Sequence, residues 1–244
     1  MARRNGRVES QRILLVCTSN PRLGDSDRET GVWAESLFSP YYFFTRKGYE
    51  VTLASVKGGK LPIDPKSVVT PYLTTVVKKG LTDDFIMARV NTTACIVYID
   101  GAEFDGVFIV DGLGIMWDGV YNSEIIRVVQ ESLRAGKMVA AVGHGVAALC
   151  NVTDDRGNFI VAGKQMTGTT DTEEELLGAG GMVPFSIEAK LRKYGAIFKQ
   201  GTSDTRPFAT RSGSIVTGQN SASSLLTAEG LVEAMSLGVR MTVV

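Results

Sequence analysis

The sequence has neither an excess of charge nor a long apolar run, and each absence excludes a class of protein. Its 26 basic and 26 acidic residues cancel, and the only basic cluster is Arg3, Arg4 and Arg7. Without a basic patch, nucleic acid is not expected as a partner. No apolar run approaches the ~20 residues of a membrane-spanning helix, and the N-terminus lacks the apolar core of a signal peptide. We therefore expect a soluble, cytoplasmic protein that binds neither nucleic acid nor membrane.

Cysteine and histidine are also scarce, with three cysteines and a single histidine in 244 residues. Cys17, Cys95 and Cys150 are odd in number and lack the spacing of metal ligands. Neither a disulfide framework nor a zinc site is therefore expected. The sequence predicts no metal and no cofactor.

Apolar runs that predict strands alternate with amphipathic stretches that predict helices. Residues 13–17 form an apolar run typical of a buried parallel strand, and residues 122–134 have the periodicity of an amphipathic helix. The alternation predicts an α/β three-layer sandwich with a mainly parallel central sheet. Residues 1–10 are expected to be a flexible tail and residues 11–244 a single domain. Residues 159–162 and 165–167 suggest a hairpin.

The stretch from Met138 to Cys150 carries the strongest signal of chemistry. An apolar run over residues 138–142 meets Gly143-His144-Gly145 and passes at once into a helical pattern of small residues. This pattern is typical of a nucleophile elbow, a tight strand-to-helix turn with a strained backbone. We expect His144 to have an unusual backbone conformation at the carboxyl edge of the sheet. The preceding position, which usually carries Cys or Ser in such an elbow, is Gly143, which has no side chain to attack a substrate.

Six motifs, in order along the chain, resemble the ThiJ/PfpI superfamily. They occupy residues 30–35, 62–65, 111–118, 140–145, 167–174 and 216–220. Within this superfamily the chain is most similar to the glyoxalase III and chaperone branch, whose cousins are the class I glutamine amidotransferases. The resemblance covers nearly the whole chain after residue 10. It implies a flavodoxin-like fold and usually a homodimer.

The resemblance also assigns candidate catalytic residues. It implies a Cys-His dyad with an acidic partner and a glutamate from the first helix that hydrogen-bonds the thiol. His144 matches the dyad histidine, Glu174 its acidic partner and Glu35 the helix glutamate. The chain departs at Gly143, the nucleophile position, and at Leu113, where this branch usually has histidine. Because both departures fall in the site, they favour altered chemistry over random drift.

The remaining candidates are expected to bind the substrate. They are Trp33, Gly112, Leu113, Gly114, Trp117, Asp118, Gly143 and Gly145. Asp118 and the amides of residues 112–114 would line an oxyanion site, although a plain turn explains the glycines with similar force. The tryptophans and Leu113 predict a pocket suited to a fairly apolar small-molecule substrate.

Each catalytic candidate also has a purely structural explanation. Glu35 lies among apolar residues that would raise its pKa and suit it to proton transfer, yet it also fits an exposed helix position. His144 fits either a general base or a relic that holds the turn. Glu174 belongs to an acidic run that a solvated helix start explains equally well. Cys17 is the only thiol placed to replace the nucleophile, but a buried free cysteine more often behaves as a small apolar residue.

Three classes of function therefore stay open. The first is a cofactor-independent enzyme that uses Glu35 and His144 for non-covalent acid/base chemistry on a small carbonyl compound, as a lyase, hydratase, cyclase or isomerase. The second is glyoxalase III-like dicarbonyl detoxification, in which the covalent step needs a thiolate. The third is a non-catalytic chaperone or ligand-binding protein with a fossil site. Retention of Glu35, His144 and Glu174 together favours the first class.

Overall fold

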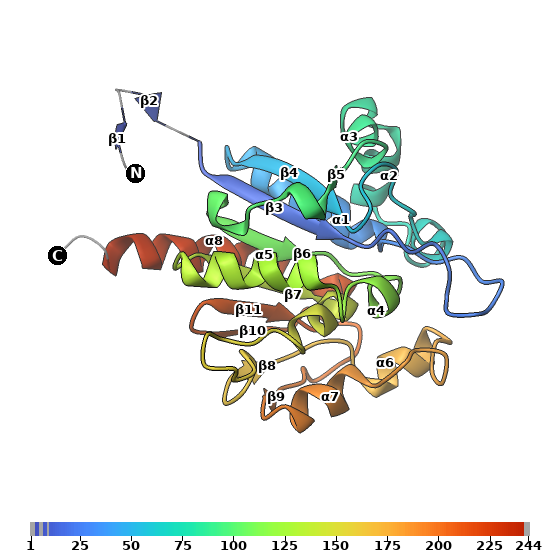
Figure 1. Cartoon of the computed structure of the whole chain (residues 1–244). Helices are drawn as coiled ribbons and strands as arrows, with labels where there is room; N and C mark the ends of the chain where they lie inside the picture. The colour runs from blue at the N-terminus through green and yellow to red at the C-terminus, as the bar shows by residue number, and fades with distance from the viewer. Residues whose placement is uncertain (1–2, 5–6, 9, 242–244) are drawn as a thin grey trace.

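The computed structural model describes residues 3–4, 7–8 and 10–241 and is built around a seven-stranded sheet (Figure 1). The strand order is β10-β11-β7-β6-β3-β4-β5. The strands are β3 (Arg12–Cys17), β4 (Glu50–Ser55), β5 (Ala94–Cys95), β6 (Gly106–Ile109), β7 (Met138–Val142), β10 (Ala209–Ser212) and β11 (Ile215–Gly218). Within this sheet β10 runs antiparallel to β11, and the other neighbours pair in parallel. The predicted α/β fold with a mainly parallel central sheet is confirmed.

Helices cover both faces of the sheet. One face carries α4 (Ile115–Asp118), α5 (Ser123–Arg134) and α7 (Ile187–Lys193), whose buried side chains share one apolar core. The other face carries α1 (Ala34–Arg46), α2 (Thr75–Thr82), α3 (Asp84–Val90) and α8 (Ser224–Met241), which share a second core. Figure 1 shows α5 and α8 on opposite sides of the strands. Helix α6 (Asp171–Leu176) and the short helices η1 (Pro65–Val68), η2 (Ile96–Tyr98), η3 (Gly101–Glu103), η4 (Gly143–Leu149) and η5 (Ser221–Ser223) complete the main elements.

The apolar run of β3 explains its central place in the sheet. Leu14 and Val16 contribute to one core, and Ile13, Leu15 and Cys17 contribute to the other. Successive side chains of a strand point to opposite faces, so a strand covered on both sides must be apolar at every position. The core residues of β3 are fully buried, as this placement requires.

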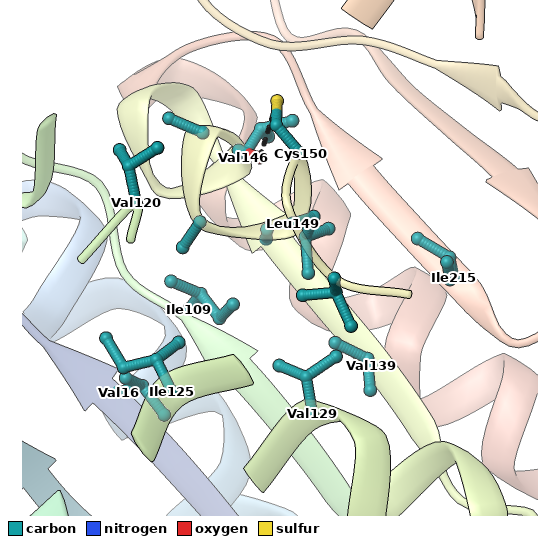
Figure 2. Packing of buried hydrophobic residues seen from close by; sticks show 14 of the residues in the cluster. Val16, Ile109, Val120, Ile125, Val129, Val139, Val146, Leu149, Cys150 and Ile215 are labelled. Carbon is teal, nitrogen blue, oxygen red and sulfur yellow. Dashed lines mark hydrogen bonds between the residues drawn. The ribbon is translucent and has the colours of Figure 1, made fainter. Parts of the chain in front are cut away.

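The segment after β7 is held in place by apolar packing. Figure 2 shows Val146, Leu149 and Cys150 packed in one cluster with Ile109 of β6 and Val139 of β7. The helix expected after the turn is present, and residues 143–149 form it as the 3₁₀ helix η4. This packing buries Cys150 fully, and burial raises the pKa of its thiol to about 12.

The hairpin expected over residues 159–167 is wrong. Residues 160–164 form turns, and β8 (Gln165–Met166) pairs in parallel with the distant β9 (Ile197–Phe198). The apolar residues that suggested a strand pack into the core from these turns. Ile160 and Val161 are buried, and Phe159 stacks on Tyr194 with the ring centroids 4.1 Å apart.

Half of the residues in the flexible tail expected over 1–10 lie outside the described residues. In this region the structure describes an antiparallel pairing of β1 (Arg3–Arg4) with β2 (Arg7–Val8). Among the helices that the structure describes, none has both the length and the apolar character needed to cross a bilayer.

Candidate active site

The neighbouring strands β6 and β7 bring Asp111 and His144 together at the carboxyl edge of the sheet. Ile109 pairs with Ala141 in parallel register, so the turns that follow the two strands begin side by side. Gly143 takes a φ of 56°, and His144 is the second residue of η4. The unusual backbone that we expected at His144 therefore falls on Gly143. Glycine has no Cβ, so it adopts the left-handed region without steric cost.

A side chain at residue 143 would displace the Asp111 side chain. A Cβ built on Gly143 would overlap the carboxyl group of Asp111. The Oδ1 atom of Asp111 accepts hydrogen bonds from the backbone N–H groups of Gly112 and His144, each at 2.8 Å. It also lies 2.9 Å from Nδ1 of the His144 ring. A carboxylate therefore occupies the space that a nucleophile on residue 143 would need.

His144 is held between two carboxylates. Its Nδ1 lies 2.9 Å from Oδ1 of Asp111 and its Nε2 lies 3.0 Å from Oε1 of Glu174, so the predicted pairing with Glu174 is confirmed as geometry. Ionised carboxylates only accept hydrogen bonds, so both ring nitrogens carry protons in this arrangement. Burial lowers the pKa of His144, but the two carboxylates more than reverse this and raise it to about 10. A general-base role for His144 at neutral pH does not fit this geometry.

The acidic run after Thr170 is not a solvated helix start. Glu173 and Glu174 are 5% and 4% exposed. Oε2 of Glu173 accepts from the backbone N–H of Thr170, while its Oε1 accepts from the side-chain amides of Gln219 and Asn220. Burial raises the pKa of Glu173, and these hydrogen bonds oppose the rise. The run therefore supplies two internal carboxylates.

Glu35 occupies a different electrostatic setting. It is the second residue of α1 and half-buried, and its carboxyl group accepts a hydrogen bond from the hydroxyl of Thr74. Burial raises the pKa of Glu35, and the Thr74 hydrogen bond only partly opposes the rise. The backbone N–H of Trp33 donates to the carbonyl of Asp111 at 2.9 Å, which fixes the start of α1 beside the end of β6. The expected upward shift of the Glu35 pKa is confirmed.

A cavity of about 320 Å³ opens above these groups. Its walls come from the start of α1, the segment before α2, the turns after β6, β7 and β11, and helix α6. Trp33 and Tyr72 meet edge to face with their ring centroids 4.9 Å apart. The lining residues are Trp33, Glu35, Pro71, Tyr72, Thr74, Asp111, His144, Thr169, Glu173, Leu176, Leu177, Asp204, Thr205, Asn220, Ser221 and Ala222.

The structure brings only part of the expected substrate-binding set to this cavity. Trp33 lines it, and Leu113 lines an adjoining hollow instead. The residues that do not line the cavity are Gly112, Gly114, Trp117, Asp118, Gly143 and Gly145.

The Asp118 side chain, expected at an oxyanion site, does not line the cavity. The Asp118 carboxylate accepts from the hydroxyl of Thr18 and the backbone N–H of Ser19, each at 2.7 Å, and so anchors the loop after β3. Gly112 is needed for packing, because a Cβ there would overlap the carbonyl of Gly31.

Cys17 does not replace the missing nucleophile. It is fully buried, burial raises the pKa of its thiol, and its side chain contributes to the core beneath α1. None of the cavity-lining residues is a cysteine. In the described part of the chain, no group of three or more His, Cys, Asp or Glu side chains is arranged to hold a metal ion.

Several cavity residues were missed from the sequence. Asp111 follows a buried strand and precedes a glycine turn, a placement that signals a functional carboxylate, but it is absent from the expected site residues. Glu173 was hidden in the acidic run, and Asn220 follows the last strand. Tyr72 and Thr74 lie in a stretch of weak periodicity that offers no signal.

Residues 30–233 match the model of the DJ-1/PfpI family. The chain belongs to this family. It is 29% identical to Glyoxalase 3 of Candida albicans over 91% of this chain and 98% of that protein. It is 28% identical to the glutathione-independent glyoxalase HSP31 of Saccharomyces cerevisiae over 92% of this chain and 98% of the relative.

Two similar proteins of known structure have the same architecture. The Rapid Encystment Protein of 24 kDa from Francisella tularensis superimposes with a TM-score of 0.87 at 31% identity, covering 92% of this chain and 99% of that one. The glyoxalase III structure from Candida albicans gives a TM-score of 0.85 at 29% identity, covering 92% and 97% of the two chains. The DJ-1/PfpI fold is therefore present over most of the described chain.

Proposed function

We propose that this chain is a cofactor-independent enzyme that transfers protons on a small carbonyl compound, with Glu35 as the acid/base group and no covalent thiol intermediate. The observation that carries the proposal is the Asp111 carboxylate in the space beside Gly143. The resemblance places the family's thiol at residue 143, and in this chain that residue is a glycine with the Asp111 carboxyl group in the adjacent space. The chemistry must therefore come from another group in the cavity.

Glu35 is the carboxyl group best suited to that task. A general base works best when its pKa lies near the working pH, and burial moves the pKa of Glu35 in that direction. A carboxylate that lines the cavity can take a proton from the carbon beside a carbonyl group and return it to a neighbouring atom. Lyases, hydratases and isomerases share this step, and a well-placed acid/base group supplies ~10²–10⁴-fold in rate.

Proton exchange with solvent tests this role without knowledge of the natural substrate. Aliphatic and aryl-substituted ketones are incubated with the protein in D₂O, and deuterium incorporation beside the carbonyl is followed by NMR. Glu35→Gln keeps the shape of the side chain and removes its titration, so we expect enzyme-dependent exchange to fall at least ~100-fold. Glu175→Gln changes an exposed glutamate outside the cavity and should leave the rate unchanged. Equal rates for Glu35→Gln and the wild type, or no exchange with any ketone, would contradict the proposal.

The names of the relatives favour a second candidate, glutathione-independent conversion of dicarbonyls. Without a thiol, a hydrated dicarbonyl would have to move a proton from one carbon to its neighbour, a step that Glu35 could also assist. We expect negligible formation of lactate from methylglyoxal, because no cysteine lines the cavity. Substantial lactate formation by the wild type, unaffected by a thiol-blocking reagent, would replace the first candidate with the second.

A further inference from the structure

The cavity is lined by more acidic than basic groups. Glu35, Asp111, Glu173 and Asp204 line it, and its lining residues include neither lysine nor arginine. His144 is the only histidine of the lining, and the carboxylates of Asp111 and Glu174 already oppose its positive charge. A ligand in this cavity therefore meets a negative electrostatic environment.

One of these carboxylates has an oxygen without a protein partner. Oδ1 of Asp111 receives the two backbone N–H groups and the imidazole Nδ1. No donor among the described residues reaches its Oδ2, although the side chain is only 6% exposed and lines the cavity. A carboxylate oxygen that faces a cavity and has no protein donor can accept from a ligand, and a cationic nitrogen is the donor that complements its charge.

The walls of the cavity suit the apolar part of such a ligand. Trp33 and Tyr72 form an edge-to-face pair, and Leu176 and Leu177 come from the region of α6. Aromatic faces attract cations as well as apolar groups. The volume of about 320 Å³ is within the range of small-molecule sites.

Two basic residues line the adjoining hollow, and each donates a hydrogen bond to a backbone carbonyl. Lys66 donates from Nζ to the carbonyl of Leu177 at 2.9 Å, and Arg28 donates to the carbonyl of Gly178 at 2.7 Å. That hollow also contains Asp27, Glu29 and Asp64. Both side chains keep their positive charge, but they lie in the hollow with these carboxylates, and neither lines the acidic cavity.

We propose that the cavity binds a substrate that carries a positively charged nitrogen on a compact apolar body, with Oδ2 of Asp111 as its counter-ion. This inference rests on the proposed function, because it names the substrate class of the same cavity. It is tested by binding alone, so it does not depend on catalysis.

Three probes with the same phenylethyl body and different charge provide the test. Phenethylamine is cationic at neutral pH, 2-phenylethanol is neutral and phenylacetate is anionic. Isothermal titration of the full chain should show phenethylamine binding at least ~10-fold more tightly than 2-phenylethanol, with phenylacetate the weakest. Equal affinity for the amine and the alcohol, tighter binding of either competitor, or no binding of the amine would overturn the inference.

Asp111→Asn then tests the assigned counter-ion. The amide oxygen can still accept from the backbone N–H groups of residues 112 and 144, but the negative charge is lost. We expect the amine-to-alcohol affinity ratio to fall by at least ~5-fold. Asp171→Asn removes an exposed carboxylate from the start of α6 that does not line the cavity, so it should keep the wild-type ratio. An unchanged ratio in folded Asp111→Asn would exclude Asp111 as the counter-ion.

Two further readouts keep the outcomes separate. If circular dichroism shows that Asp111→Asn does not fold, Glu173→Gln removes another charge of the lining and should also reduce the ratio. A wild type without charge preference whose proton exchange still depends on Glu35 would overturn only this inference. A clear preference for the amine without Glu35-dependent exchange would overturn only the proposed function.

Discussion

The cavity has two halves, and each contains an ionisable group whose surroundings favour a different charge state. At the elbow, His144 has a carboxylate within 3.0 Å of each ring nitrogen. At the start of α1, Glu35 is half-buried and has one hydroxyl donor, from Thr74. The first group is locked in its charged form, and the second is shifted towards its neutral form.

This difference separates a structural role from a reactive one. A histidine whose two N–H groups are both committed has no lone pair to accept a proton from a substrate. A carboxyl group that burial alone destabilises as an anion can gain or lose a proton near neutral pH. Within one cavity, the elbow half should therefore determine stability and the helix half should determine the rate.

The largest expected effect is on stability at the elbow. His144→Ala leaves the buried carboxylates of Asp111 and Glu174 without the cation between them, which should cost ~3–5 kcal/mol of unfolding free energy. Glu35→Ala removes one hydrogen bond at a half-buried position and should cost ~1 kcal/mol or less. Urea denaturation measures both. Equal losses of unfolding free energy for the two variants would contradict the stabilising role assigned to the elbow half.

The pH dependence of stability should reveal the same locked cation. The pKa of His144 rises from 6.5 to about 10 on folding, so its stabilising contribution is complete below pH 6.5 and is lost as the pH rises through about 10. Between these values one extra proton is bound to the folded state, which corresponds to ~1.4 kcal/mol per pH unit. The wild type should lose stability with this additional slope relative to His144→Gln in urea titrations from pH 7 to pH 9.5. Parallel curves would show that His144 is neutral in the folded protein.

A smaller effect is expected when the elbow is given a thiol. Gly143→Cys alone would place its Cβ against the Asp111 carboxyl group in a left-handed conformation, so this variant should stay inactive and lose stability. The double substitution of Gly143→Cys with Asp111→Ala removes the overlap. We expect it to form a trace of lactate from methylglyoxal that iodoacetamide abolishes. Activity in Gly143→Cys without the second change would show that Asp111 does not block the position.

The smallest effect is expected at the helix half. Thr74→Val removes the hydrogen bond that lowers the pKa of Glu35, so that pKa should rise further. The acidic limb of the pH-rate profile for proton exchange should then move to higher pH while the plateau rate stays similar. Thr75→Val changes the next, exposed residue and serves as the control. An acidic limb that does not move would assign it to a group other than Glu35.

Local patterns in the sequence predicted much of the fold and part of the site. Residues 13–17 predicted a strand buried on both faces, and the glycine turn after residue 142 predicted the elbow. The same patterns failed over residues 159–162, where buried apolar side chains come from turns. Apolar character predicts burial more reliably than it predicts backbone conformation, because a short apolar run can be buried in a strand, a helix or a turn.

The sequence by itself determined the alternation of strands and helices, the glycine-flanked turn after residue 142, and the motif positions of Glu35, His144 and Glu174. Only the tertiary structure decided what surrounds each of them. Asp111 and His144 are 33 residues apart, and their contact exists because β6 and β7 are parallel neighbours. Strand order is set by the packing of the whole sheet, and no local pattern encodes it. For the same reason the charge of His144, the burial of Cys17 and the acidic lining of the cavity follow from long-range contacts.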